Sequence, residues 1–452
     1  MLVKSGLLLK DCYVGLLLLL LGFALRLLYV INLDISIPIR GDAIAYMQYA
    51  SNLIEYGVFS RGDSLSPLPD SYWAPGFPAF LAACILLSKI FNAEFYSLVL
   101  VLQAFLGGVA VVLTYATGRL FLSKLYSVIA SIFVILSPHL VSFSGYFLSE
   151  TLLSVLLLAG IFFFLKCVLY CQGSLLPILS GFFFGMAYLT NPVVFFVPLV
   201  LATLFLFAQT KNNKSKVFRF LVIVIFAYGA IVSAWAIRNY VNVPAGQGSD
   251  AGRAFENLII GSHQNYHDIW RNNPRDPDNP ADKDIALYKT NQAAFFPVLA
   301  ERAAKKPFDY LNWYFIGKPM ELWGWNILVG QGDIYVYPVN STLYYTSKLA
   351  LISLVIMKNI HYWLLAVAII GLFLAIKDEN LERRVIVVGI YSCLMVVSVV
   401  YIVLHTDGRY SVPLRPEMYL CAAYGLQLIV AWVKKKNVGL QAQSSNNELR
   451  DK

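Results

Sequence analysis

The residues whose types could do chemistry lie beside long apolar runs. Asp42 follows the first run, in Arg40-Gly41-Asp42-Ala43-Ile44-Ala45-Tyr46, Glu150 begins a later run, and Arg409 precedes the last one. An arginine in such a place can bind phosphate at the bilayer surface through charge-assisted hydrogen bonds. Ionisable groups at the edge of such a run are costly unless they are paired or functional.

Each of these residues also has an ordinary structural interpretation. Asp42 could cap the N-terminus of an amphipathic helix, because the residues after it have helical spacing. Glu150 could stand in the first turn of a helix and face lipid headgroups. Arg409 could anchor the chain at a membrane interface beside Tyr410. Spacing alone leaves both interpretations of each residue open.

Other candidate motifs are weaker. His263 and His267 have the spacing of a zinc-binding helix, but they lack a His-Glu-x-x-His frame and are interpreted as solvated loop histidines. The sequence has no phosphate-binding loop, no dinucleotide glycine fingerprint and no hydrolase elbow, so nothing supports nucleotide-driven transport. The basic clusters at 211–219 and 434–436 are typical of topology signals in membrane proteins rather than nucleic-acid contacts.

Composition indicates the class of protein that positions these residues. Of the 452 residues, 58% are apolar and 13% are charged, with 35 basic and 26 acidic side chains. A soluble domain carries about 25% charged residues, so an ordinary cytosolic enzyme is excluded. The expected fold class is an all-α polytopic membrane protein.

We expect about ten transmembrane helices, within a range of about 9 to 12, because ten apolar runs can cross about 30 Å of hydrocarbon. They cover roughly 13–31, 95–117, 124–143, 148–170, 175–190, 191–208, 218–237, 359–376, 385–404 and 413–433. Two weaker runs, 76–91 and 344–357, are expected to form juxtamembrane helices. The basic loops then all fall on one side, which the positive-inside rule makes the cytoplasm, together with both termini.

This topology puts two long segments on the outer face. The chain then divides into four parts. A first transmembrane module, 1–237, contains the outer catalytic loop 32–94, and a polar outer region, 238–358, follows it. The C-terminal transmembrane helices, 359–433, precede a basic, polar cytoplasmic tail, 434–452. Asp42 and Glu150 then lie on the same face, although they are far apart in the sequence. Their placement favours a shared site.

Several short motifs occur in an order that resembles a known family. They are Asp42 with Tyr46, Tyr72-Trp73-Ala74-Pro75-Gly76-Phe77-Pro78, Gly118-Arg119-Leu120-Phe121, Ser137-Pro138, Ser149-Glu150-Thr151, the run from Gly181 to Pro192, and Arg409-Tyr410 with Pro413 and Pro416. Together they resemble family-39-like GT-C glycosyltransferases, relatives of protein O-mannosyltransferases and of the aminoarabinose and galacturonic acid transferases that act on lipid A. The likeness covers roughly 10–240 well and 380–433 weakly, and the order of the motifs is more specific than any one of them.

The chain departs from this family in two places. Many relatives have Asp-Glu where this chain has Asp42-Ala43, so a second acid is missing. Many have Arg-Pro-Pro or Lys-Pro-Pro where it has Trp73-Ala74-Pro75, so a basic residue is lost. The polar segment 238–343 matches no known motif and is expected to govern the acceptor. The donor sugar and the acceptor therefore stay open.

The resemblance implies a glycosyltransferase that moves a sugar from a polyprenyl-phosphate donor to a lipid, glycan or protein acceptor on the outer face, with inversion. Asp42 would be the general base, and Glu150 would orient the acceptor or a bound cation. Arg409, and Arg40 after it, would oppose the leaving phosphate. The substrate-binding residues implied are Arg40, Tyr46, Trp73, Arg409 and Tyr410. Some members use a divalent metal cation, but no cluster here names its ligands, and no other cofactor is implied.

The basic inner loops fit a bacterial inner membrane or an endoplasmic reticulum membrane. The sequence has no evident retention signal and no glycosylation-rich outer loop, so we expect the bacterial inner membrane. The expected partners are the donor, the acceptor and membrane lipid, with no nucleic acid.

Two other functions compete with transfer. A transporter or flippase of a lipid-linked sugar would favour ionisable residues at mid-membrane and broken helices in two repeated halves. The candidates here sit at the mouths of spans, and the two halves of the sequence do not look alike. In a structural membrane subunit, substitution of Asp42 or Glu150 would change assembly rather than catalysis.

Overall fold

The structure is a computed structural model that describes residues 2–63, 65–170, 173–208, 214–273, 276 and 278–448. Over these ranges the chain is almost entirely helical, with one two-stranded sheet. Part of the basic cluster at 211–219 and residues 449–452 of the predicted tail lie outside the described residues. The predicted all-α membrane fold class is confirmed.

Among the described residues, seven helices are long and apolar enough to cross a membrane. They are α1 (Leu2–Ile31), α4 (Phe95–Gly118), α7 (Glu150–Tyr170), α10 (Lys214–Asn242), α18 (Lys348–Ile376), α19 (Leu381–Val403) and α20 (Arg415–Glu448). An eighth span is formed if α5 (Lys124–Leu136) and α6 (Pro138–Ser142) cross together, with a bend of 54° between them. The bend falls at Pro138, because a proline cannot donate to the preceding turn and forces the residue before it into extended backbone.

Three shorter apolar helices are α3 (Gly76–Phe91), α8 (Leu175–Thr190) and α9 (Val197–Ala208). The ten predicted spans correspond to the seven long helices, the bent pair, α8 and α9. At about 1.5 Å per residue, α8 and α9 are shorter than about 30 Å of hydrocarbon, so the number of crossings stays a prediction. The chain is a multi-pass integral membrane protein.

The expected surface helix at 344–357 was wrong in its bounds. Residues 348–376 form one continuous helix, α18, and only the short α17 (Leu343–Thr346) precedes it. The side chain of Ser347 accepts a hydrogen bond from the Ala350 amide and starts α18. The sequence has no glycine or proline between Lys348 and Ile370, so nothing ends the helix at the polar residues Lys358 and Asn359. The predicted domain boundary at 358 therefore falls inside a helix.

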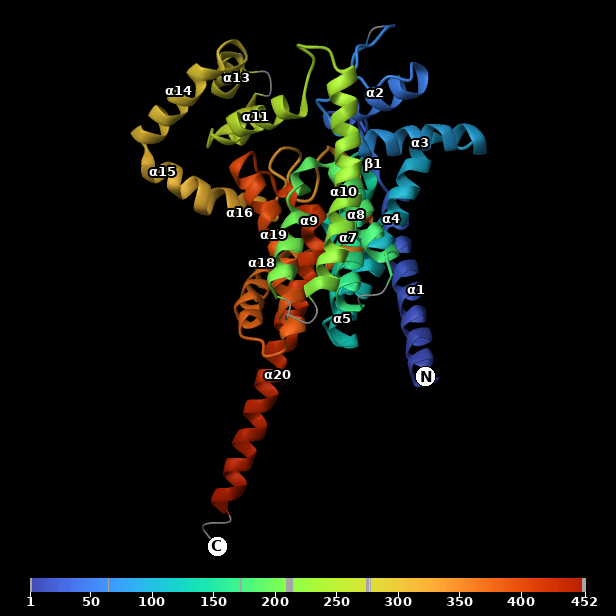
Figure 1. Cartoon of the computed structure of the whole chain (residues 1–452), viewed down its shortest axis with the longest axis vertical. Coiled ribbons are helices and arrows are strands. Elements are labelled where there is room, and N and C mark those ends of the chain that lie inside the picture. Colours follow the sequence, from blue (N-terminus) through green and yellow to red (C-terminus); the bar gives the residue numbers. More distant parts are fainter. Residues whose placement is uncertain are drawn as a thin grey trace.

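The start of α1 and the end of α20 lie at one end of the helical bundle, and the long loops lie at the other (Figure 1). We call the latter the loop end. α2 (Asp42–Glu55) and α3 run across the bundle there. A short antiparallel pairing of β1 (Asp34–Ile35) with β2 (Val339–Ser341) ties the first loop to the region after residue 322. Two segments far apart in the sequence thus meet at the loop end.

The loop end also carries a set of helices that we call the helical arm, residues 250–322. It comprises α11 (Asp250–Gly261), α12 (Tyr266–Asn272), α13 (Pro280–Thr290), α14 (Gln292–Lys305), α15 (Pro307–Asn312), a π-helical turn (Trp313–Gly317) and α16 (Lys318–Leu322). Ser249, Asn279 and Asn291 cap α11, α13 and α14 by accepting backbone hydrogen bonds. These caps satisfy amides that have no partner within their helices.

The bundle and the helical arm have separate apolar cores. The arm buries Ile259, Tyr288 and Phe295 in a small cluster of its own. In the bundle, close approach of helices depends on small residues: a Cβ on Gly181 of α8 would lie 2.4 Å from the Val224 carbonyl of α10. Small residues at such crossings are typical of helix packing in membranes.

Candidate functional site

A cavity of about 550 Å³ opens at the loop end between the first loop, the helical arm and the segment before α20. Its walls come from Arg40–Asp42 and Tyr72–Trp73 of the first loop, from α11, from 329–338 and from 405–410. We call it the site cavity. An adjoining cavity of about 230 Å³ shares Trp73, Arg253 and Tyr410 with it and continues toward the ends of α8 and α19.

Asp42 is the first residue of α2, and its carboxylate bonds across the molecule to Arg409. The Nη2 of Arg409 lies 2.5 Å from Oδ2 of Asp42. The N-cap of α2 is Gly41, whose φ of 56° belongs to a region that favours glycine, and no side chain caps this helix. The N-cap interpretation of Asp42 was therefore wrong.

The charges around Asp42 keep its carboxyl ionised. Burial alone would raise the pKa of Asp42, but the positive charges of Arg409 and Arg253 and the hydrogen bond from Arg409 outweigh burial. Its pKa therefore lies below the ordinary value. Asp42 faces the site cavity as a carboxylate at neutral pH.

Arg409 reaches Asp42 because its own backbone is held firmly. Asp407 accepts hydrogen bonds from the backbone N–H groups of Leu328, Val329 and Arg409, at 3.2, 3.0 and 3.1 Å. A Cβ on Gly408 would lie 2.4 Å from the Asn326 carbonyl, so glycine permits this close approach. The short helix η4 (Gly408–Leu414) then begins with Arg409 facing the cavity.

The aromatic side chains predicted for the site lie together. Tyr46 packs edge-on against Trp73 with ring centroids 4.8 Å apart, and Tyr410 stacks on Tyr401 at 4.8 Å. Both Tyr46 and Trp73 line the adjoining cavity with Tyr410. Arg40 lines the site cavity, and its carbonyl accepts a hydrogen bond of 2.7 Å from the Tyr337 hydroxyl.

Glu150 lies behind these residues rather than in the cavity wall. It is the first residue of α7 and only 8% exposed, so the interpretation of a carboxylate facing lipid headgroups was wrong. Within the described residues its Oε2 has no hydrogen-bond partner. Its neighbour Ser149 is 3.4 Å from the Tyr46 hydroxyl, and Asp42 and Arg409 are close enough for charge interactions with it.

Sequence reasoning missed Arg253. It lies on α11, lines both cavities, and has its guanidinium carbon 3.5 Å from the centre of the Trp73 ring. Such a cation–π contact fixes the orientation of the guanidinium. No ion pair of Arg253 occurs within the described ranges of the chain. Its segment matches no motif, so no signal in one sequence marks it.

The two histidines with zinc-like spacing face different partners. His263 pairs with Asp284 at 2.9 Å and with Arg302 at 2.8 Å, inside the helical arm, while His267 bonds to the Thr406 carbonyl at 2.7 Å. They are therefore neither zinc ligands of one site nor solvated loop residues. Over the described residues no group of three or more His, Cys, Asp or Glu could hold a metal ion, so no metal ligands are assigned.

Neither a family model nor a curated protein matches the sequence. The structure is similar to the oligosaccharyltransferase AglB from Archaeoglobus fulgidus in complex with an inhibitory peptide and a dolichol-phosphate, with a TM-score of 0.53 and 14% identity over 95% of this chain and 52% of that one. It is similar to an oligosaccharyltransferase from the same organism in complex with Zn and sulfate, with a TM-score of 0.52 and 13% identity over 92% and 49% of the two chains. ArnT from Cupriavidus metallidurans bound to undecaprenyl phosphate aligns over 94% of this chain and 60% of its own, at 11% identity, with a TM-score of 0.45 that is too low to support a shared fold by itself.

These likenesses concern the fold. The chain spans about half the length of the archaeal structures that it matches, since 52% of the AglB chain is covered. Nearly all of this chain takes part, including the helical arm that carries no recognised motif. The resemblance stated from the motifs is confirmed at the level of the fold: the chain has the fold of the GT-C membrane glycosyltransferases.

Proposed function

We propose that this chain is a glycosyltransferase that moves a sugar from a polyprenyl-phosphate donor to a lipid, glycan or protein acceptor in the site cavity. One observation carries the proposal: the carboxylate of Asp42, held by Arg409, faces a cavity that also contains the cation Arg253. A carboxylate beside a hydroxyl and a guanidinium beside a phosphate are the two groups that this transfer needs. The fold supports it, because a GT-C relative carries dolichol-phosphate.

Arg253 is our first candidate for the donor phosphate. It stands where the two cavities meet, and the adjoining cavity is lined by Val193, Val400 and Leu404 at the ends of bundle helices. A polyprenyl chain can leave along this apolar wall while its phosphate stays beside the guanidinium. The arginine stabilises the charge that grows on the phosphate as the sugar leaves.

Arg409, the first candidate from the sequence, has a shared role in this proposal. Asp42 engages Nη2 of its guanidinium, and a guanidinium has five N–H donors. Arg409 can thus hold Asp42 and still contact the donor phosphate. Arg40 lines the same cavity beside Tyr337 and is the next candidate after Arg253 and Arg409.

Asp42 is the proposed base. The acceptor oxygen bonds to the anomeric carbon while the bond from that carbon to the phosphate oxygen breaks, and the proton of the acceptor hydroxyl passes to Asp42. Attack on the face opposite the phosphate inverts the anomeric centre. A carboxylate of low pKa serves here because the hydroxyl becomes acidic only as its bond to carbon forms. Glu150 interacts with Arg409 through charge and is a positioning residue in this scheme.

We place the site cavity at the outer face of a bacterial inner membrane, with both termini in the cytoplasm. The support is the distribution of charge at the end of the bundle opposite the loop end: Lys377 follows α18, Arg383 and Arg384 lie in the first turn of α19, and the triplet 434–436 lies in the second half of α20. Basic residues at such ends favour the cytoplasm.

A transporter or flippase of a lipid-linked sugar is the competing function. One observation favours it: Glu417 of α20 is fully buried, and in the described part of the chain neither carboxylate oxygen has a hydrogen-bond partner. Ionisable groups inside a span often mark a transport path. The polar cavity at the loop end, however, places the charged groups where a transferase needs them.

Release of polyprenyl phosphate separates the two functions. Purified protein in lipid nanodiscs is given a panel of polyprenyl-phosphate sugars, with membrane extract as the source of acceptor. We expect the wild type to release polyprenyl phosphate from at least one donor and Asp42→Asn to release it about 10²–10⁴-fold more slowly. No release from folded wild-type protein with any donor, together with movement of the donor between leaflets of a vesicle, would replace the transferase by a flippase.

A further inference from the structure

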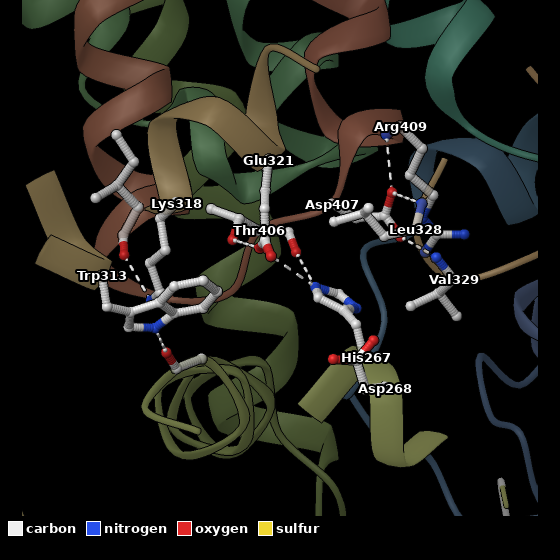
Figure 2. Close-up of polar contacts among 12 residues, drawn as sticks. His267, Asp268, Trp313, Lys318, Glu321, Leu328, Val329, Thr406, Asp407 and Arg409 are labelled. Carbon is white, nitrogen blue, oxygen red and sulfur yellow. Dashed lines mark hydrogen bonds and ion pairs between the residues drawn. The ribbon is translucent and has the colours of Figure 1, made fainter. Parts of the chain in front are cut away.

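The segment 402–409 connects the end of α19 to η4 and leads directly to Arg409. Residues 404–407 form no helix or strand, so their backbone groups need partners from outside the segment. Figure 2 shows these partners arriving from α12 and α16 of the helical arm, on one side of the segment, and from 328–329 on the other.

Lys318 holds the start of this segment. Its Nζ donates to the carbonyls of Ile402 and Leu404, at 2.7 and 3.1 Å, and lies 4.1 Å from the centre of the Tyr314 ring. The side chain is fully buried. A Cβ on Gly261 would lie 1.6 Å from the Leu404 oxygen, so the end of α11 closes over the same carbonyl. An ammonium at the last carbonyls of a helix is stabilised by the charge that they carry.

Glu321 and His267 hold the middle of the segment. The Thr406 hydroxyl donates to Oε2 of Glu321 at 3.2 Å, and the Thr406 carbonyl accepts from Nε2 of His267 at 2.7 Å. Burial lowers the pKa of His267, so the ring is neutral. Since a carbonyl can only accept, Nε2 carries the proton. Asp407 then fixes the end of the segment, next to Arg409.

We propose that Lys318 and Glu321 of α16 are positioning residues for the transfer reaction: they hold 402–407 so that Arg409 is set against Asp42. This inference rests on the proposed function. Neither side chain lines either cavity, so they act through the backbone that precedes Arg409. Among the described residues, four hydrogen bonds join the helical arm to the segment, and Lys318 supplies two of them from a single buried atom. Loss of its Nζ leaves the two carbonyls without a partner.

The charged groups around α16 make the contacts of Lys318 and Glu321 with the segment depend on pH. The groups that face Lys318 and Glu321 from the packed elements are Tyr314, His267, Asp268, His405 and Asp407. Burial, opposed by Glu321, lowers the pKa of Lys318 to about 7. Burial raises the pKa of Glu321 to about 7. The negative charges of Asp407 and Asp268 raise it further, while the hydrogen bond from Thr406 and the charge of Lys318 lower it.

The sign of the effect follows from these values. As pH rises through about 7, Lys318 loses its proton and its attraction to the two carbonyls, and Glu321 becomes an anion beside Asp407. Loss of the Lys318 charge loosens the segment, because a neutral amine holds the two carbonyls less strongly, whereas the Glu321 anion keeps its hydrogen bond from Thr406 and strengthens it. Turnover by the wild type should therefore fall on the alkaline side of pH 7, while donor binding at Arg253 should change little.

The test combines kinetics with hydrogen exchange on the full-length protein in nanodiscs. Lys318→Met should lower kcat about tenfold or more, change the donor KM by less than about twofold, and remove the alkaline fall. Glu321→Gln keeps an acceptor for Thr406 and should retain most of kcat with a shifted pH profile. Lys305→Met is the matched control, because within the described residues Lys305 pairs with Glu301 alone, on the exposed face of α14. It should match the wild type.

Hydrogen exchange separates this inference from the proposed function, because it needs no activity. Lys318→Met should speed exchange at 326–329 and 402–409, where Asp407 organises the backbone, and leave exchange in α7 unchanged. Unchanged exchange at 402–409 would overturn the positioning role even if kcat fell. Faster exchange with full turnover and an unaltered pH profile would overturn it as well. An inactive wild type that shows the faster exchange in Lys318→Met would instead reject the transferase and retain the contact.

Discussion

The bundle and the helical arm differ in how they are held and in what they contribute to the site. The bundle buries a continuous apolar core in which large side chains such as Phe164, Phe184 and Tyr419 are fully or almost fully enclosed. The core of the arm contains Ile259, Tyr288 and Phe295, with few further apolar neighbours. A small core stabilises the arm less, so local unfolding of the arm costs less free energy than local unfolding of the bundle.

The site divides along the same line. Asp42 belongs to the first loop and Arg409 to the segment before α20, and both lie among the motifs that resemble the GT-C family. Arg253 and Lys318 come from the arm, which matches no motif. Under the proposed function, the bundle side supplies the base, and the arm supplies the donor-binding Arg253 and the positioning residue Lys318.

The largest effect should come from the bundle side. Asp42→Asn removes the proposed base and keeps the size of the side chain, so kcat should fall about 10²–10⁴-fold with little change in thermal stability. The measurement is release of polyprenyl phosphate under saturating donor. Asp63→Asn, an exposed acid of the same loop, is the control and should retain full turnover. A rate within threefold of the wild type in Asp42→Asn would remove the base from the mechanism.

The next effect should separate the stability of the two regions. Phe295→Ala empties the small core of the arm and should cost it about 3–5 kcal/mol. Hydrogen exchange should then rise across 250–305 while the bundle helices keep their protection. Phe296→Ala is the matched control, since Phe296 is 48% exposed. Equal loss of protection in both regions would show that they unfold as one unit and would break the comparison.

A third effect tests whether the arm binds the donor. Arg253→Gln removes the cation above Trp73, and loss of a charge-assisted contact of about 1.5–3 kcal/mol should weaken donor binding about tenfold to a hundredfold. The donor KM, or the affinity for polyprenyl phosphate itself, reports it. Lys283→Gln removes an exposed charge from the same arm and should have no effect. A lower kcat with unchanged affinity would move Arg253 from binding to positioning.

Much of the bundle could be predicted from the sequence, because apolar runs and basic loops follow from the bilayer itself. The separate helix at 344–357 could not be bounded in this way. Lys358 interrupts the apolar pattern but not the backbone hydrogen bonds of α18, so hydropathy suggested two helices where the backbone forms one.

The site was predictable in its residue types and not in its contacts. Asp42 and Arg409 were recognised as candidates, but their pairing joins positions 367 residues apart, and no spacing rule reaches that far. Arg253 has no motif around it, and Lys318 looks in the sequence like any surface lysine. Burial of Lys318 depends on the packing of α16 against the end of α19, a tertiary contact that local sequence does not reveal.

The smallest predicted effect concerns pH and tests whether Arg409 tunes Asp42. A carboxyl whose pKa is lowered in the folded protein stays ionised until the pH falls below its ordinary value, so the acid limb of turnover should lie below about pH 4. The contribution of the Asp42 carboxylate to the stability of the folded protein is present above that pH range and is lost as pH falls through the lowered pKa.

Arg409→Gln removes the main charge that lowers the pKa of Asp42 and leaves burial, which raises this pKa. The acid limb should therefore move to higher pH, with a lower kcat at all pH values. Arg384→Gln, at the opposite end of the bundle, should leave the limb in place. If the acid limb does not move in Arg409→Gln, a group other than Asp42 determines it. The catalytic base would then have to be a residue closer to the helical arm.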